Sequence, residues 1–158
     1  MGAKAIKIPM KNNGLDLEAM VEAINEKTKI IWLCNPNNPT GGIFTKRELD
    51  NILNKIPEDV IIVMDEAYGE YVNSEEYPDS LELIKSYPNM IILKTLSKAY
   101  GLASLRFGYG IANEEIVDYM EYVKMITTNK LATKVKKADL KHNSDLSRLD
   151  IVDDYALK

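Results

Sequence analysis

Short apolar runs alternate along the chain with segments whose apolar residues recur every three or four positions. The runs lie at Ile30–Leu33, Val60–Met64, Met90–Leu93 and Phe107–Ala112. Such runs, bounded by polar and turn-forming residues, are typical of strands in a layered domain. They therefore predict four strands, and Ala5–Ile8 predicts a further short strand near the amino end.

The intervening segments have the periodicity of amphipathic helices. A helix is expected over Leu15–Asn25, with Asp16 near its N-terminal cap. Thr45 and Glu48 have the spacing of a capping box, in which the side chain of each residue bonds the backbone N–H of the other. The helix that follows is expected to turn these apolar residues inward: Leu49, Ile52, Leu53 and Ile56.

Two more helices complete the alternation. One is expected at Leu81–Tyr87, and Asn113 is expected to cap the other. The apolar face of that last helix consists of Ile116, Val117, Met120 and Val123. Strands separated by helices, with no hairpin signal, indicate an α/β domain with a mainly parallel sheet flanked by helices.

Composition narrows the classes of partner. The 158 residues fit one domain, and 46% of them are hydrophobic, which is enough for a core. A net charge of -4 offers no basic stripe for nucleic acid, and no apolar run is long enough to cross a membrane. The single histidine argues against a histidine-based metal site, and the single cysteine cannot form an internal disulfide. We therefore expect a cytoplasmic protein without nucleic-acid, membrane or metal partners.

Polar clusters follow three of the expected strands. They are NPNNPTG at 35–41, DEAY at 65–68 and TLSKAYGL at 95–102. In open α/β sheets ligands bind at the carboxyl ends of strands, so the clusters are expected to meet at one crevice. Asp65 directly follows an apolar strand, where an unpaired charge would cost several kcal/mol to bury. It is therefore expected to have a cationic partner.

As a set, in this order and spacing, these blocks resemble the pyridoxal-phosphate-dependent aminotransferases of fold type I, and most closely the histidinol-phosphate aminotransferases. The match rests on NPNNPTG at 35–41, DEAY at 65–68, SKAYGLA at 97–103 and LRFGY at 105–109. It covers residues 1–126 and implies a partial large domain that binds pyridoxal 5'-phosphate. Residues 127–158 are expected to form a disordered or weakly helical tail, with an oligomerising coil as the alternative.

The resemblance implies roles for particular residues in binding the cofactor and in catalysis. Lys98 is similar to the lysine that binds the cofactor aldehyde as an imine and then shuttles a proton between substrate and cofactor. Asp65 is similar to the carboxylate that keeps the pyridine nitrogen protonated. Asn38 and Tyr68 resemble the pair that donates hydrogen bonds to the phenolic oxygen of the ring.

A second group of residues is expected to bind the cofactor phosphate. Arg106 resembles the phosphate-binding arginine of the family, whose planar fork suits two phosphate oxygens. Thr95 and Ser97 could add hydroxyl donors to the same phosphate. Either hydroxyl could instead cap a local turn.

The resemblance also implies a reaction and an assembly. A homodimer would move an amino group between a small donor, such as histidinol phosphate or glutamate, and a 2-oxo acid. Threonine-phosphate decarboxylases share the motifs and are one alternative. A truncated, non-catalytic remnant is another, because the family's proteins are longer than this chain.

Overall fold

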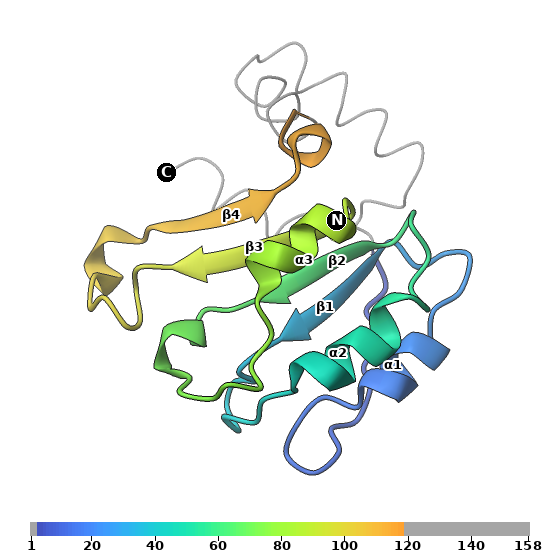
Figure 1. Ribbon diagram of the computed structural model, residues 1–158, viewed down its shortest axis with the longest axis horizontal. Coiled ribbons are helices and arrows are strands. Elements are labelled where there is room, and N and C mark those ends of the chain that lie inside the picture. The colour runs from blue at the N-terminus through green and yellow to red at the C-terminus, as the bar shows by residue number, and fades with distance from the viewer. Residues whose placement is uncertain (1–2, 119–158) are drawn as a thin grey trace. The chain divides into compact units, whose positions relative to one another are not determined.

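The computed structural model describes residues 3–118, and within them a four-stranded sheet has the order β1-β2-β3-β4 (Figure 1). Its strands are β1 Ile30–Cys34, β2 Ile61–Asp65, β3 Met90–Thr95 and β4 Gly108–Ala112. The first three are parallel, whereas β4 runs antiparallel to β3. The predicted α/β fold with a mainly parallel sheet is therefore confirmed, with one antiparallel edge that the apolar runs did not indicate.

The strand predicted at Ala5–Ile8 does not form, so that prediction is wrong. A strand needs a neighbour to take its backbone hydrogen bonds, and residues 5–8 have no ladder partner among the residues described. The first ladder contact is an isolated bridge between Lys11 and Gly14. Asn12 and Asn13 connect its ends with φ values of 50° and 61°, the left-handed conformation that tight hairpin turns require.

The helices α1 Leu17–Glu22, α2 Lys46–Leu53 and α3 Ser80–Ser86 lie over one face of the sheet (Figure 1). The Asp16 side chain caps α1 as expected, because it accepts a hydrogen bond from the Ala19 N–H at 3.2 Å. The capping box of α2 and the helix predicted near Leu81 are likewise confirmed. The capping signals of Asp16 and Thr45 thus located the starts of α1 and α2, whereas α3 starts at Ser80, one residue before the predicted position, with Asp79 as its cap.

Helix ends differ more from expectation. The first helix stops at Glu22, short of Asn25, whose side-chain oxygen accepts a hydrogen bond from the Lys27 N–H at 3.0 Å. Such local bonding competes with the helical pattern. Residues 114–118 are helical, and Asn113 accepts a hydrogen bond from the Glu115 N–H at 3.1 Å, as a cap should. The rest of that helix, with Met120 and Val123, and the segment 127–158 lie outside the described residues.

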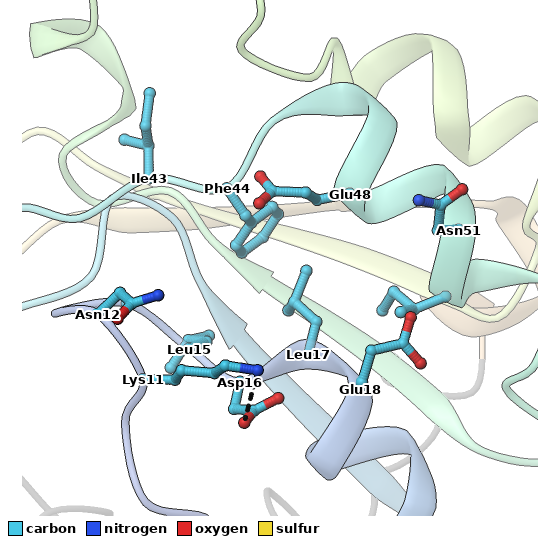
Figure 2. Close-up of a pocket in the computed structure, with 12 residues that line it drawn as sticks. Lys11, Asn12, Leu15, Asp16, Leu17, Glu18, Ile43, Phe44, Glu48 and Asn51 are labelled. Carbon is cyan, nitrogen blue, oxygen red and sulfur yellow. Dashed lines mark ion pairs between the residues drawn. The ribbon is translucent and has the colours of Figure 1, made fainter.

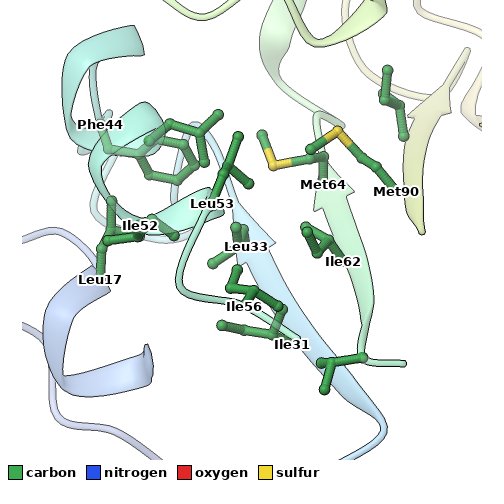
Figure 3. Close-up of a cluster of buried hydrophobic side chains, with 13 residues drawn as sticks. Leu17, Ile31, Leu33, Phe44, Ile52, Leu53, Ile56, Ile62, Met64 and Met90 are labelled. Carbon is green, nitrogen blue, oxygen red and sulfur yellow. The ribbon is translucent and has the colours of Figure 1, made fainter. Parts of the chain in front are cut away.

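The hydrophobic core fills the space between the helices and the sheet (Figure 3). All the residues expected to point inward from α2 are buried: Leu49, Ile52, Leu53 and Ile56. They pack against alternate strand residues such as Leu33, Ile62 and Met64, each with 0% exposure. Burying one such side chain fully contributes roughly 1.5–3 kcal/mol, so these buried residues are a major source of stability for the packing of helices on the sheet.

The two faces of the sheet differ in what they carry near the strand ends. Because side chains alternate along a strand, Asp65 and Thr95 project from the face opposite the core. Trp32 lies on that same face and is 50% exposed. Glu66 follows Asp65 and Lys94 precedes Thr95, so both side chains project from the opposite face of the sheet, which the helices cover.

Replacing Thr45 by alanine should lower the free energy of unfolding by about 1 kcal/mol, because it removes the N-cap of α2. The Thr45 hydroxyl accepts from the Glu48 N–H at 3.2 Å, and Glu48 accepts from the Thr45 N–H at 2.7 Å. Urea denaturation measures the change. Glu48→Gln is the matched control, since glutamine also closes a capping box and should leave stability nearly unchanged. Equal stability of Thr45→Ala and the parent would contradict the prediction.

Candidate active site

The carboxyl ends of β1, β2 and β3 lie at one edge of the sheet, and the loops that follow them gather there (Figure 1). The strands end nearly level, because Cys34 pairs with Asp65 and Asp65 with Leu93. Since β4 runs back from the same edge, the whole loop 96–107 also belongs to it. The parallel strands therefore bring the three polar clusters to one edge of the sheet, as predicted.

Lys98 lies in the turn that follows β3. Gly101 allows this turn, because its φ of 66° is a left-handed conformation that glycine adopts without strain. The Gly101 N–H donates to the Lys98 carbonyl at 3.0 Å, and the Leu102 N–H donates to the Leu96 carbonyl at 3.0 Å. The Lys98 amine lies 4.9 Å from the centroid of the Tyr68 ring, within the range of a cation–π contact. Two predicted site residues from different loops are thus in contact.

Asp65 is half-buried at the end of β2. Its carboxylate accepts hydrogen bonds from the Trp32 indole N–H at 3.3 Å and from the Ala67 N–H at 3.2 Å. Both donors are neutral, so the cationic partner expected for this residue is not found among the residues described. An ionised carboxylate can accept about four hydrogen bonds, which leaves capacity for a further donor.

Tyr68 and Asn38 line the same surface hollow, which has a volume of about 610 Å³. The Tyr71 ring also lines it and lies 6.2 Å from the Tyr68 ring, centroid to centroid. Asn38 is exposed, whereas Asn35 is buried and bonds the Phe44 N–H and carbonyl at 3.1 and 3.2 Å. The loop 35–41 is therefore held by Asn35, and Asn38 is left facing solvent.

The expected phosphate-binding residues lie around the loop 96–107. The Thr95 hydroxyl donates to the Phe107 carbonyl and accepts from the Ser97 N–H, both at 3.1 Å, so it ties the two ends of the loop together. This is the turn-capping use that the sequence left open. Arg106 is exposed with a left-handed φ of 48°, and its guanidinium donates to the Ala103 carbonyl at 3.4 Å. Within the described residues, no hydrogen bond or ion pair joins Arg106 to Asp65 or Lys98.

Sequence reasoning missed an ionic cluster on the helix side of the same edge. The Lys94 amine lies 3.1 Å from a carboxylate oxygen of Glu66 and 3.1 Å from one of Glu70. The Ser80 hydroxyl donates to the other oxygen of Glu66. The Glu66 side chain is only 6% exposed. Burial alone would lower the pKa of Lys94, but its hydrogen bonds and the charges of Glu70 and Glu66 outweigh burial and raise that pKa.

Tyr77 extends this cluster towards the loop after β1. Its hydroxyl donates to the Asn35 carbonyl, which links the segment 72–79 to the loop that carries Asn38. Burial, together with the charges of Glu66 and Glu70, raises the pKa of Tyr77 well above its usual value. Tyr77 therefore stays a neutral hydrogen-bond donor at physiological pH.

A second hollow, of about 290 Å³, lies between the residues around α1 and those of α2 (Figure 2). It includes the Lys11–Asp16 ion pair and the Glu48 carboxylate but none of the predicted site residues. In the part of the chain that the structure describes, no cluster of three or more potential ligands could hold a metal ion. Likewise, no helix in that part is long and apolar enough to span a membrane.

Solved structures with a similar fold include an aminotransferase and a decarboxylase. A histidinol-phosphate aminotransferase from Sinorhizobium meliloti, solved in complex with pyridoxal-5'-phosphate, superposes with a TM-score of 0.67 at 30% identity, over 75% of this chain and 32% of that one. An L-threonine-O-3-phosphate decarboxylase from Porphyromonas gingivalis gives a TM-score of 0.55 at 31% identity, over 78% of this chain and 38% of that one.

Sequence comparison indicates the same family. The histidinol-phosphate aminotransferase of Brevibacillus brevis is 51% identical over 141 residues, which are 89% of this chain and 39% of that protein. The chain thus spans less than half the length of this relative. The family model for aminotransferase class I and II matches residues 1–138, which includes all three polar clusters. The chain therefore belongs to the class I and II aminotransferases.

Proposed function

We propose that this chain carries the cofactor-binding part of a pyridoxal-phosphate-dependent aminotransferase. The enzyme would move an amino group between a donor resembling histidinol phosphate and a 2-oxo acid. The observation that carries this proposal is the contact between the Lys98 amine and the Tyr68 ring, at 4.9 Å. Tyr68 follows Asp65, the last residue of β2, by three positions. Relatives that are 51% identical to this chain are named histidinol-phosphate aminotransferases, which supports the same substrate class.

The donor set at this edge fits pyridoxal phosphate chemically. The cofactor has an aldehyde, a basic ring nitrogen, a phenolic oxygen and a phosphate. The edge carries an exposed primary amine on Lys98, a carboxylate with spare acceptor capacity on Asp65, and a guanidinium on Arg106. When bound, pyridoxal phosphate supplies an electron sink for the bonding electrons of the substrate carbon.

Lys98 is proposed to hold the cofactor covalently and, when displaced by substrate, to move a proton at its Nζ atom. Only a primary amine performs both tasks. The turn 96–102, closed by hydrogen bonds to the Lys98 and Leu96 carbonyls, keeps the backbone in place while the side chain moves. The exposed position of the side chain leaves the amine free to change partners.

Asp65 is proposed to keep a proton on the ring nitrogen through a charge-assisted hydrogen bond. The Trp32 and Ala67 N–H groups orient its carboxylate on the sheet face opposite the core. Tyr68 and Asn38 are proposed to donate hydrogen bonds to the phenolic oxygen, and they already line one hollow. Donors to an ionised oxygen stabilise its charged form.

Arg106 and Ser97 are proposed to bind the phosphate, with Thr95 in a supporting place. The single hydroxyl hydrogen of Thr95 is donated to the Phe107 carbonyl, so Thr95 supports the phosphate site by holding the loop 96–107. Ser97 and Arg106 lie near the two ends of that loop. An arginine fork suits two phosphate oxygens better than a lysine does.

Titration of the purified chain with pyridoxal phosphate tests the proposal. Uptake should shift the cofactor's visible absorbance and saturate at one cofactor per chain. Pyridoxal, which lacks the phosphate, is the matched ligand and should bind more weakly because it forgoes the contact with Arg106. If neither the parent chain nor a longer polypeptide that contains it takes up the cofactor, the proposed function is wrong.

A phosphothreonine-type decarboxylase is a second candidate, favoured by the 31% identity to the Porphyromonas gingivalis enzyme over 78% of this chain. Both reactions use the same cofactor chemistry and differ in which bond of the substrate carbon is broken. Incubation with histidinol phosphate and 2-oxoglutarate, or with threonine phosphate alone, separates them by product: glutamate in the first case and carbon dioxide in the second.

We propose a cytoplasmic homodimer without nucleic-acid or membrane partners. The net charge of -4 and the pI near 5.1 support the absence of nucleic acid. Sedimentation of the purified protein measures the assembly state directly.

A further inference from the structure

The ionic cluster on the helix side of the site edge joins two segments that carry predicted site residues. Lys94 belongs to β3, whose continuation bears Lys98, whereas Glu66 and Glu70 flank Tyr68 on the other segment. The Lys94 amine reaches both carboxylates at 3.1 Å. The Lys94 ammonium group therefore pairs with one carboxylate on each side of Tyr68 in the chain.

We propose that Lys94 is a positioning residue, which clamps Glu66 and Glu70 and thereby holds the Tyr68 ring against the Lys98 amine. We call these three residues, Lys94, Glu66 and Glu70, the clamp. The inference rests on the proposed function, because it assigns the clamp to the same cofactor site. None of the three touches the reacting groups, so their action passes through Tyr68 and Lys98.

The backbone around Tyr68 has few hydrogen bonds of its own to keep it rigid. Gly69–Tyr71 form a single 3-10 turn, closed by the Gly69 N–H to Glu66 carbonyl bond at 2.9 Å and the Tyr71 N–H to Tyr68 carbonyl bond at 3.1 Å. Short 3-10 turns have poor hydrogen-bond geometry and little rigidity of their own. Two ion pairs on either side of Tyr68 supply the constraint that the turn lacks.

The burial of the Lys94 and Glu66 charges also indicates that they position the chain rather than stabilise the fold. The side chains of Lys94 and Glu66 are 19% and 6% exposed, so their desolvation offsets much of their attraction. An apolar pair of similar volume could stabilise the fold equally well. An apolar pair would not fix the spacing between β3 and the Tyr68 segment, because apolar contacts have no preferred direction. The ammonium group of Lys94 does fix it, because its three N–H donors form directional bonds to two carboxylates.

Hydrogen exchange of the chain without cofactor tests the clamp directly. In Glu70→Ala and Lys94→Met, the amides of Gly69, Tyr71 and Val72 should exchange about tenfold faster or more, the factor expected from one lost charge-assisted hydrogen bond. Lys94→Arg keeps both ion pairs and should restore slow exchange. Lys85→Met is the matched control, because Lys85 forms an exposed ion pair with Glu82 on α3. Amides of the β2 core should not change in Glu70→Ala.

The second arm uses the cofactor-loaded protein. Glu70→Ala should weaken pyridoxal phosphate binding and shift the pH at which the bound cofactor's absorbance changes, because Tyr68 and Lys98 set that pH. A purely structural role would lower the unfolding midpoint and leave this pH unchanged. Glu70 is the residue of choice here, since its removal leaves Glu66 paired with Lys94 and the fold intact.

The possible results test the clamp and the proposed function separately. Unchanged exchange at Gly69, Tyr71 and Val72 in both clamp variants would overturn the clamp, whatever the cofactor does. Faster exchange with an unshifted absorbance profile would overturn the positioning role. Lack of cofactor uptake by the parent protein would instead count against the proposed function, and the exchange arm would still decide whether the clamp exists.

Discussion

Replacing Lys98 by alanine should abolish the absorbance of bound pyridoxal phosphate and lower the rate of amino transfer by about a thousandfold or more. The reason is that one amine both anchors the cofactor and moves the proton. Alanine should keep the backbone of the turn 96–102, because the hydrogen bonds that close this turn do not use the Lys98 side chain, so the fold should survive. Absorbance spectra and kcat, measured on the same preparation, report the two losses separately.

Two control variants sharpen this test. Lys98→Arg keeps the positive charge beside the Tyr68 ring but cannot form the covalent bond, so it should fail as completely as alanine. Lys85→Ala removes an exposed lysine of α3 and should leave both measurements unchanged. An unaltered spectrum in Lys98→Ala would remove Lys98 from its proposed role.

The sequence predicted the site edge because its signals there are local. The apolar runs end at Leu33, Met64 and Leu93 and so place the following polar residues at strand ends, and parallel pairing brings those ends together. The capping signals of Asp16 and Thr45 worked for the same reason, since each needs only residues three positions away.

Features that depend on distant partners were harder to predict. The short alternation at Ala5–Ile8 resembles a strand, but pairing requires a neighbour that no local pattern reports. The antiparallel direction of β4 is set by the loop 96–107, whose length gives no hairpin signal. The cationic partner expected for Asp65 is not found in the described part of the chain, which leaves an acceptor for a ligand.

The sequence predicts part of the clamp, and the strand register supplies the rest. If Asp65 faces one side of the sheet, Glu66 must face the other and be buried by the helices. A buried carboxylate requires a cation, and the register that pairs Asp65 with Leu93 brings Lys94 level with Glu66. The predicted strand ended at Leu93, so Lys94 was not considered part of the sheet.

Replacing Asp65 by asparagine should lower the rate of amino transfer by about ten- to 200-fold, which corresponds to the loss of a charge-assisted hydrogen bond worth about 1.5–3 kcal/mol. A neutral amide cannot hold a proton on the ring nitrogen as a carboxylate does. The expected loss is smaller than for Lys98, because the cofactor can still bind covalently. Single-turnover kinetics with histidinol phosphate would isolate the proton-transfer step.

The Asp65→Asn variant should fold normally, which makes the kinetic result interpretable. The Asn oxygen can still accept from the Ala67 N–H, and the half-exposed Trp32 can turn its indole N–H to water. Asp79→Asn is the matched control: Asp79 caps α3 through the Leu81 and Glu82 N–H groups, and asparagine caps equally well. If Asp65→Asn and Asp79→Asn keep the same rate, the charge of Asp65 takes no part in the chemistry, and the ring nitrogen must find its proton elsewhere.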